Sequence, residues 1–281
     1  MIFVSTGQYK NVTLDENLKF MMINGIKNVE LSGGVYDPNL IQTLEKYRGK
    51  INFSFHNYFP PPKVPFTLNL ATLNEELFNL CKKHIIETIR LASKFNQRFY
   101  SFHAGFLIDP QPSELGKKIL KKKINDENKA TDIFLNRLSD ISTEAKKEGI
   151  EILIENNVLN YQNYKTFKTN PFMMASLAQS INIVKNFPRN VNILLDLAHL
   201  KVTANTLDFS PVEYLEKLEH KIKAYHISDN NGEHDSNDLI SENSWFHKYI
   251  KKDKNFFTLE LQNRDVHILK KQIKILERML K

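Results

Sequence analysis

The main pattern along the chain is an alternation between short apolar runs and longer segments in which apolar residues recur at helical spacing. The short runs are rich in β-branched and aromatic residues and end in polar residues, which is typical of strands. The predicted strands are Ile2–Ser5, Asn28–Leu31, Ile51–Phe55, Arg98–Phe102, Ile150–Ile154, Val191–Leu195, Ile222–Tyr225 and Phe256–Leu259.

The longer segments predict helices, and Asn74–Phe95 is the clearest of them because it is apolar at Leu77, Leu80, Cys81, Ile85, Ile89 and Ala92. Asn74 and Asp265 are expected N-caps. The other predicted helices are Leu14–Asn24, Pro38–Tyr47, Asn128–Glu148, Pro171–Phe187, Val212–Leu218 and Asp265–Leu280.

Strands that alternate with helices over the whole length predict a parallel sheet. Eight units with no strand left over favour a closed (β/α)8 TIM barrel over an open doubly wound sheet. We therefore expect residues 1–281 to form one barrel domain. The irregular stretches 58–68, 107–116, 158–169 and 230–244 all follow strands, so they are expected at the barrel mouth, where such enzymes keep their sites.

Composition narrows the class of protein. The one cysteine, Cys81, rules out an intramolecular disulfide and is expected to be a buried apolar residue. No apolar run approaches the roughly 18 residues of a membrane helix, and the short N-terminal run reads as a strand, so a cytosolic protein with no membrane partner is expected. The net charge of +7 favours an anionic partner, although the lysines at 117, 118, 121, 122 and 123 are expected on solvated helix faces.

Ionisable residues gather where the predicted strands end. Four of the nine histidines, His56, His103, His199 and His226, lie there together with Glu30, Glu155, Asp196 and Glu260. A charged group after an apolar strand is costly to bury unless it is paired or bound to a metal. Glu30 is expected either to anchor substrate or to pair within the barrel. A set of three carboxylates and one imidazole drawn from these residues would suit Mn2+, Mg2+, Co2+ or Zn2+. Such an ion would polarise a carbonyl or hydroxyl of a substrate and stabilise an enediolate.

The segments that end these strands resemble those of the xylose isomerase-like TIM-barrel superfamily, which includes sugar isomerases, sugar epimerases and endonuclease IV. The resemblance covers essentially the whole chain, and each motif is weak alone. The segments are Phe55-His56-Asn57-Tyr58, Phe102-His103-Ala104-Gly105, Leu153-Ile154-Glu155-Asn156, Leu195-Asp196-Leu197-Ala198-His199, His226-Ile227-Ser228-Asp229-Asn230 and Leu259-Glu260.

In the isomerase and epimerase branch, the resemblance implies that one metal is held by Glu155, Asp196, His226 and Glu260. It implies that Glu155 and Glu260 also act as the acid and base that move a proton next to a carbonyl. The expected substrate is a sugar or sugar phosphate, and a homo-oligomer is one expected assembly. The residues expected to contact substrate or a second metal are His56, His103, His199, Asp235 and Asn157.

The endonuclease IV branch implies three zinc ions and nine ligands, of which eight are matched. The ninth, expected two residues after Asp235, is Asn237, which is a poor zinc ligand. The loops after the first two strands hold only Lys10 as a base, and the proline-rich loop 58–68 suits a pocket wall or subunit contact better than DNA insertion. We therefore favour the small-molecule enzyme over a nuclease of abasic-site DNA. A barrel that binds metal or sugar without turnover is a third alternative.

Overall fold

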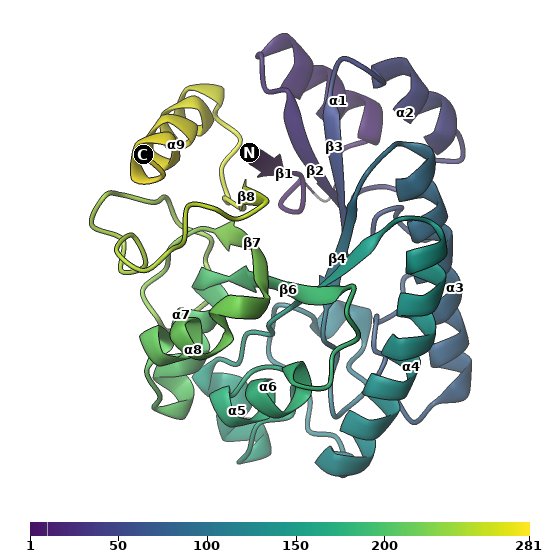
Figure 1. Cartoon of the computed structure of the whole chain (residues 1–281), viewed down its shortest axis with the longest axis vertical. Helices are drawn as coiled ribbons and strands as arrows, with labels where there is room; N and C mark the ends of the chain where they lie inside the picture. The colour runs from purple at the N-terminus through teal and green to yellow at the C-terminus, as the bar shows by residue number, and fades with distance from the viewer. Residues whose placement is uncertain (10) are drawn as a thin grey trace.

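A computed structural model describes residues 1–9 and 11–281, so Lys10 lies outside the described residues. Eight parallel strands close into a barrel in chain order, with β8 beside β1 (Figure 1). The predicted (β/α)8 fold is confirmed, and each predicted strand matches an observed one to within two residues at either end. The strands are β1 Ile2–Ser5, β2 Asn28–Ser32, β3 Asn52–His56, β4 Phe99–His103, β5 Glu151–Glu155, β6 Val191–Asp196, β7 Ile222–Ile227 and β8 Phe256–Leu259.

Helices surround the barrel (Figure 1). Asn74 and Asp265 cap α3 and α9 as predicted, each accepting hydrogen bonds from two backbone N–H groups in the first turn. The helices are α1 Leu14–Ile23, α2 Leu40–Tyr47, α3 Glu75–Lys94, α4 Glu127–Lys147, α5 Tyr161–Phe167, α6 Leu177–Val184, α7 Leu197–Leu207, α8 Pro211–Leu218 and α9 Val266–Met279, with 3-10 turns η1 Pro112–Glu114 and η2 Glu219–Lys221.

The predicted helix Pro171–Phe187 is wrong in its first turns, because α6 begins only at Leu177. Residues before it pair instead with the chain after β4, where the Met173 N–H donates to the Gly105 carbonyl at 3.1 Å. The Asn170 side chain accepts from the Phe172 N–H at 3.0 Å and bends the backbone away from a helix. Two helices were missed: α5 lies in the stretch 158–169 that was expected to be irregular, and α7 follows β6 directly.

The prediction that the lysines at 117–123 lie on helix faces is wrong. This stretch is irregular and belongs to the loop between β4 and α4. The Glu114 carboxylate shapes it by accepting from the Leu120 N–H at 2.9 Å and pairing with Lys122 at 3.0 Å. These basic residues therefore lie on the mouth side of the barrel.

The barrel interior has two tiers, because alternate residues of a strand point inward. The lower tier is an apolar floor, which Phe99 packs against; its buried members are Phe3, Leu153, Leu194, Ala224 and Phe256. Two residues further along the strands, the inward positions become ionisable or hydroxylic. The outward positions, such as Ile152 and Ile154, join the main core against the helices. The sequence therefore places the ionisable groups above a water-excluding base.

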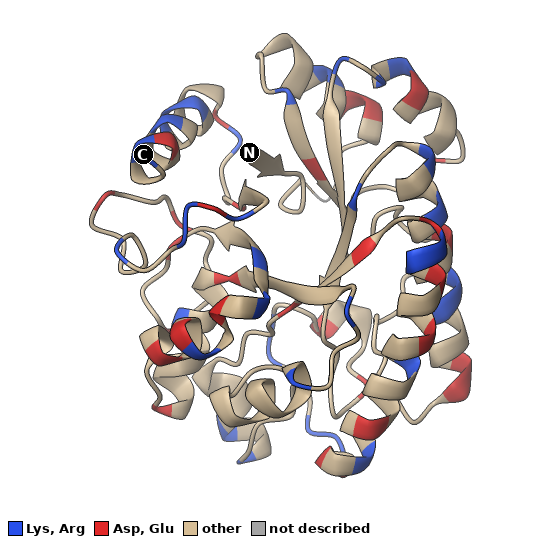
Figure 2. Ribbon diagram, viewed as in Figure 1, with Lys and Arg blue, Asp and Glu red and all other residues tan. Residues whose placement is uncertain are grey.

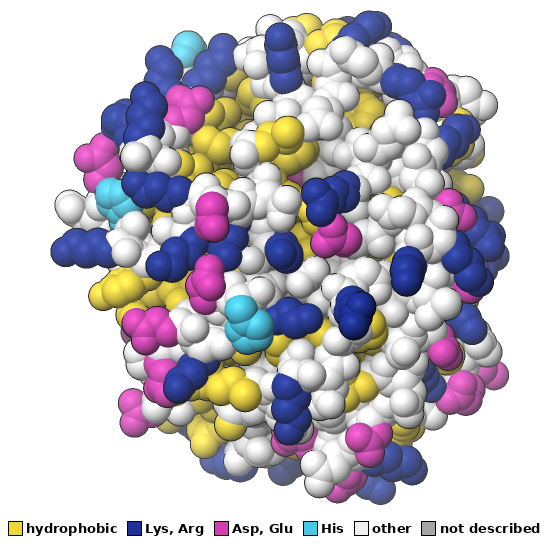
Figure 3. Space-filling model, in the orientation of Figure 1, with side chains coloured by type: hydrophobic (Ala, Val, Ile, Leu, Met, Phe, Trp, Pro, Cys, Tyr) yellow, Lys and Arg dark blue, Asp and Glu magenta, His cyan; other side chains and the backbone are white. Residues whose placement is uncertain are grey.

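Charge is distributed over the outer shell. Lys and Arg lie mostly on the helices and loops around the barrel (Figure 2), and the visible face carries basic side chains dispersed among acidic ones (Figure 3). Cys81 is fully buried, as predicted, whereas Leu80, another apolar residue of the helical pattern in α3, is 51% exposed. Over the described residues, the helices are too short or too polar to cross a bilayer.

Candidate active site and metal centre

A cavity of about 750 Å³ opens at the carboxyl ends of the strands. Its base is formed by residues at strand ends, including His56, His103, Glu155 and Glu260. Its walls come from the βα loops, among them the proline-rich loop at Pro61–Pro65 and the Lys117 stretch. Of the predicted site residues, Asn157, His199 and Asp235 also line this cavity.

The four predicted metal ligands lie together, with one ligand atom from each within 4.8 Å of the others. His226 Nδ1 is 2.9 Å from Glu260 Oε2, 3.1 Å from Glu155 Oε1 and 3.7 Å from Asp196 Oδ2. Glu155, Asp196 and His226 are buried, whereas the Glu260 side chain is 15% exposed and borders the cavity. Three carboxylates therefore converge on one imidazole nitrogen at the bottom of an open cavity.

A second group of possible ligands shares Glu155. His56 Nε2 and His103 Nε2 lie 3.2 and 3.4 Å from Glu155 Oε2. The His56 ring is oriented by a 2.9 Å hydrogen bond between its Nδ1 and the Ser101 hydroxyl. His103 stacks on His199 with ring centroids 5.6 Å apart. The structure thus brings His56 and His103 into contact with the predicted metal centre.

The hydrogen bonding of the buried carboxylate oxygens also indicates that this set of side chains fits a divalent cation. Buried polar atoms are nearly always hydrogen-bonded, yet Asp196 Oδ2 has no hydrogen-bond partner among the described residues, and Glu155 Oε2 has only the His56 and His103 nitrogens, at 3.2 and 3.4 Å. Among those residues, no Lys or Arg forms an ion pair with Glu155 or Asp196, which counts against a purely structural salt bridge. Buried carboxylate oxygens left in this way are the groups that a metal ion satisfies.

Asp196 joins the site to the fold, because it ends β6 and is also the N-cap of α7. Its Oδ1 accepts from the His199 N–H at 2.7 Å, which leaves Oδ2 to face the centre. The helix turns His199 back toward the cavity, and its Nε2 lies 3.2 Å from Asp235 Oδ2. The predicted pair Asp196 and His199 thus acts on one pocket because α7 starts immediately after the strand.

The protonation of the metal-free site follows from the burial of its ionisable groups and from the attraction between its carboxylates and its histidines. Burial alone would raise the pKa of Glu155, but the surrounding histidines lower it well below its usual value. Burial would lower the pKa of His226, but Glu30, Glu155 and Glu260 raise it well above its usual value. Burial raises the pKa of Asp196 to about 7, whereas it lowers that of His103 to about 4.

Two predicted side chains have other partners in the structure. The Asn157 amide donates to the Gly105 and Met173 carbonyls at 2.7 and 2.9 Å, so it ties loops together although it also lines the cavity. Asn237 adopts a left-handed backbone at φ 49°, which asparagine tolerates well, and accepts from the Ser228 hydroxyl at 2.9 Å. Asn237 therefore shapes a turn where a third zinc site would need a histidine.

The structure gives two residues a more definite place than the sequence did. Glu30 points into the barrel below His226, with 3.1 Å between Glu30 Oε2 and His226 Nε2. Lys117 is the one Lys or Arg among the described residues that line the cavity. Strand alternation could have placed Glu30 inward, but the wrong helix assignment hid Lys117.

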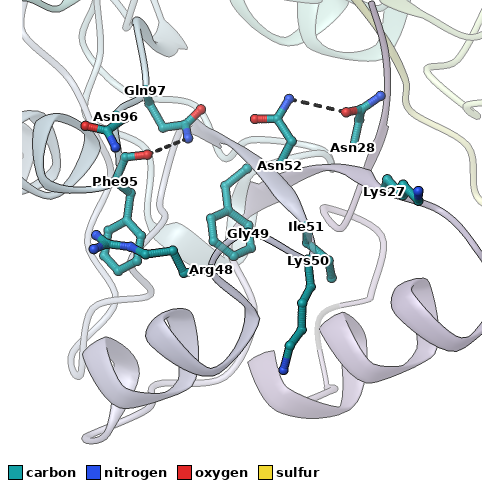
Figure 4. Close-up of a pocket in the computed structure, with 11 residues that line it drawn as sticks. Lys27, Asn28, Arg48, Gly49, Lys50, Ile51, Asn52, Phe95, Asn96 and Gln97 are labelled. Carbon is teal, nitrogen blue, oxygen red and sulfur yellow. Dashed lines mark hydrogen bonds between the residues drawn. The ribbon is translucent and has the colours of Figure 1, made fainter.

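A second cavity, of about 540 Å³, lies near the beginnings of β2 and β3, at the other end of the barrel (Figure 4). Its basic residues include Arg48, which lies over the Phe95 ring at 4.5 Å and donates to the Lys94 carbonyl. Its described lining contains no acid and no histidine. We therefore place the chemistry at the carboxyl ends of the strands.

The family model described as a xylose isomerase-like TIM barrel matches residues 25–279, and the chain belongs to this family. An uncharacterized protein of Methanocaldococcus jannaschii is 26% identical over 261 residues, covering 90% of this chain and 85% of the relative. A D-tagatose 3-epimerase-like protein superposes with a TM-score of 0.73 at 21% identity, covering 99% of this chain and 96% of the other. A putative xylose isomerase from Rhodospirillum rubrum superposes with a TM-score of 0.69 at 15% identity, covering 99% of this chain and 97% of the other. At these identities, the two solved structures support the fold alone.

Proposed function

We propose that the protein is a metal-dependent isomerase or epimerase of a sugar or sugar phosphate. The observation that carries this proposal is the convergence of three carboxylates on His226 at the base of a cavity large enough for a sugar. Membership of a family with structural neighbours described as an epimerase and an isomerase supports it. The residues that would hold the metal are Glu155, Asp196, His226 and Glu260.

When bound, the cation would polarise a carbonyl or hydroxyl oxygen of the substrate and so acidify the neighbouring C–H bond. Glu155 ends β5 and Glu260 directly follows β8, three strands away around the barrel. One carboxylate would remove the proton from carbon and the other would return it, on the opposite face for an epimerase or to the adjacent carbon for an isomerase. His199 would bind a substrate hydroxyl.

The anionic end of a phosphorylated substrate would meet Lys117. The backbone around this residue is held by the buried Asn163 side chain, which donates to the Lys117 carbonyl at 3.1 Å and accepts from the Ile119 N–H at 2.9 Å. Lys201 and Lys165 are less suitable for this role. Lys201 pairs with Asp229 at 2.7 Å, and Lys165 is exposed and outside the described cavity lining.

The test is turnover of a panel of ketoses, aldoses and their phosphates by Glu155→Gln and Glu260→Gln, with Glu151→Gln as a matched control. Glu151 starts the same strand as Glu155 but pairs with Arg98 outside the cavity. We expect each site variant to lose roughly 10²- to 10⁴-fold in kcat, while the control keeps its activity. Full activity of either site variant would overturn the two-glutamate mechanism.

Elemental analysis of the purified protein tests the metal separately. One divalent ion per chain agrees with the proposal, whereas three ions together with metal-dependent cutting of an abasic-site duplex would replace it with the nuclease. We expect no such cutting, because Asn237 is engaged with Ser228.

A further inference from the structure

We infer that Glu30 is a positioning residue that holds His226 in the one tautomer able to bind a metal through Nδ1. The inference rests on the proposed metal centre and goes beyond its four ligands. It concerns a carboxylate on β2 that lies on the side of the imidazole away from that centre.

Glu30 is fully buried, in the middle of β2. Its Oε2 lies 3.1 Å from His226 Nε2 and accepts a hydrogen bond from the Thr258 hydroxyl at 3.0 Å. Glu30, His226 and Thr258 come from β2, β7 and β8, so these contacts cross the barrel interior. Each of the three side chains is thus anchored on a barrel strand.

The opposite nitrogen of the same ring faces the metal ligands. His226 Nδ1 has three carboxylate oxygens within 3.7 Å, from Glu260, Glu155 and Asp196. A neutral imidazole carries its proton on one nitrogen only, and the other offers a lone pair. In the metal-free protein both ring nitrogens face carboxylates. When a metal ion takes the Nδ1 lone pair, the remaining proton is on Nε2, where the Glu30 carboxylate accepts it and so favours the ring form that binds through Nδ1.

The free-energy cost of burying Glu30 also indicates this role. A fully buried carboxylate lowers the stability of the fold unless it is paired, and Glu30 Oε1 has no hydrogen-bond partner among the described residues. If the position served packing alone, an apolar residue of similar volume would stabilise the barrel at least as well. Partners behind a metal-bound histidine orient the ring and make it a better donor. The unpaired oxygen is therefore a cost that metal affinity explains.

A structural alternative makes a different prediction. If Glu30 served only as the counter-ion of a doubly protonated His226, its removal would lower the stability of the metal-free protein and leave the ligand nitrogen unspecified. Metal binding would then release that proton from His226, and the identity of the bound nitrogen would not depend on Glu30. The two interpretations differ in metal affinity and in the nitrogen that binds.

The experiment measures the Kd for Zn2+ by chelator competition in wild type, Glu30→Leu and the control Thr258→Val. Leucine removes the acceptor from Nε2, whereas the control removes one hydrogen bond to Glu30 and keeps its contact with His226. We expect Glu30→Leu to weaken binding by about 10- to 100-fold and Thr258→Val by less than about threefold, since the acceptor is retained. Equal affinity of wild type and Glu30→Leu would overturn the inference.

A second measurement uses the wild type alone and so does not depend on whether a variant folds. Proton–nitrogen NMR of the Zn2+-loaded protein, with ¹⁵N-labelled histidine, should show His226 bound through Nδ1 with a slowly exchanging proton on Nε2. Binding through Nε2 would also overturn the inference. Wild type that binds no metal at all would instead refute the proposed function, so the two failures are distinguishable.

Discussion

Asp196→Asn should separate the two tasks of a single side chain. Oδ1 of Asp196 caps α7, and Oδ2 faces the proposed metal without a hydrogen-bond partner. Asparagine is about as good an N-cap as aspartate, so the variant should keep the cap. It loses the negative charge that metal binding requires. We therefore expect a metal-free protein that is more stable than wild type and a metal centre that is weaker.

The stability difference should depend on pH. Burial raises the pKa of Asp196 in the folded state to about 7 from an ordinary value of 3.8. A group with a raised folded pKa contributes most to stability below its unfolded pKa, and that contribution is lost as pH rises through the folded pKa. A difference of about three pH units corresponds to roughly 4 kcal/mol. Metal-free wild type should thus lose up to roughly 4 kcal/mol from this group between pH 4 and 8, and the variant should not.

Added metal should narrow the difference in stability between the two proteins. A ligand that binds only the folded state adds about 2.7 kcal/mol at 100 times its Kd. Wild type gains this stabilisation, and Asp196→Asn should gain little, because one of the four donors has lost its charge. At pH 8 the variant is then the more stable protein with chelator present, and it loses much of that advantage when Mn2+ or Zn2+ is added.

The assay is urea unfolding at pH 5.5 and 8.0, with chelator or with metal. Asp126→Asn is the matched control, because Asp126 caps α4 with a similar bond to the Lys129 N–H at 2.8 Å but is exposed and outside the cavity lining. We expect it to show neither the pH dependence nor the loss of metal response. The reasoning is refuted if Asp196→Asn is equally destabilised at both pH values and still gains full stability from metal.

Three further predictions concern separate parts of the molecule. Lys117→Ala should raise KM for a phosphorylated substrate by about 10- to 100-fold, because a charged hydrogen bond is lost, while kcat stays nearly unchanged. Lys118→Ala, at the exposed neighbouring residue, should leave KM unchanged. An equal effect of both variants on KM would point to general charge attraction. Arg137→Met should lower the free energy of unfolding by about 2–4 kcal/mol. The reason is that Arg137 donates to the Leu70 and Thr72 carbonyls and pairs with Glu75. The control Arg98→Met breaks an exposed ion pair and should lower the free energy of unfolding by less than about 1 kcal/mol. Burial raises the pKa of the Cys81 thiol to about 11, so an aromatic disulfide reagent should label it at pH 8 only after unfolding, and rapid labelling of the native protein would contradict the buried environment.

The barrel could be predicted because strand and helix periods are local properties of the chain. The ligand positions could also be predicted, since parallel strands bring their carboxyl ends to one face. Helix limits failed where distant groups set the backbone, as where the chain before α6 pairs with residues after β4. The prediction for the Lys117 stretch failed for a similar reason. Glu114 holds this stretch in a loop, which the local spacing of residues does not reveal.

The metal ligands and their supporting residues differ in predictability. Glu155 and Asp196 stand out because an acid directly after apolar residues is unusual in any sequence. Glu30 lies between Val29 and Leu31 in β2, yet its role depends on His226, which lies 196 positions further along the chain. Only the closed barrel reveals that these side chains meet. Sequence therefore identifies ionisable residues more readily than it pairs them.

The apolar floor has a kinetic consequence. Because Phe3, Phe256 and their neighbours fill the described barrel below the ionisable tier, we expect ions, substrate and water to enter at the mouth. A sugar seated in the cavity would lie between the metal and bulk solvent. We therefore expect metal exchange to slow when substrate is bound and chelators to inactivate the resting enzyme faster than the working one. Access to the metal would thus be controlled by the substrate itself.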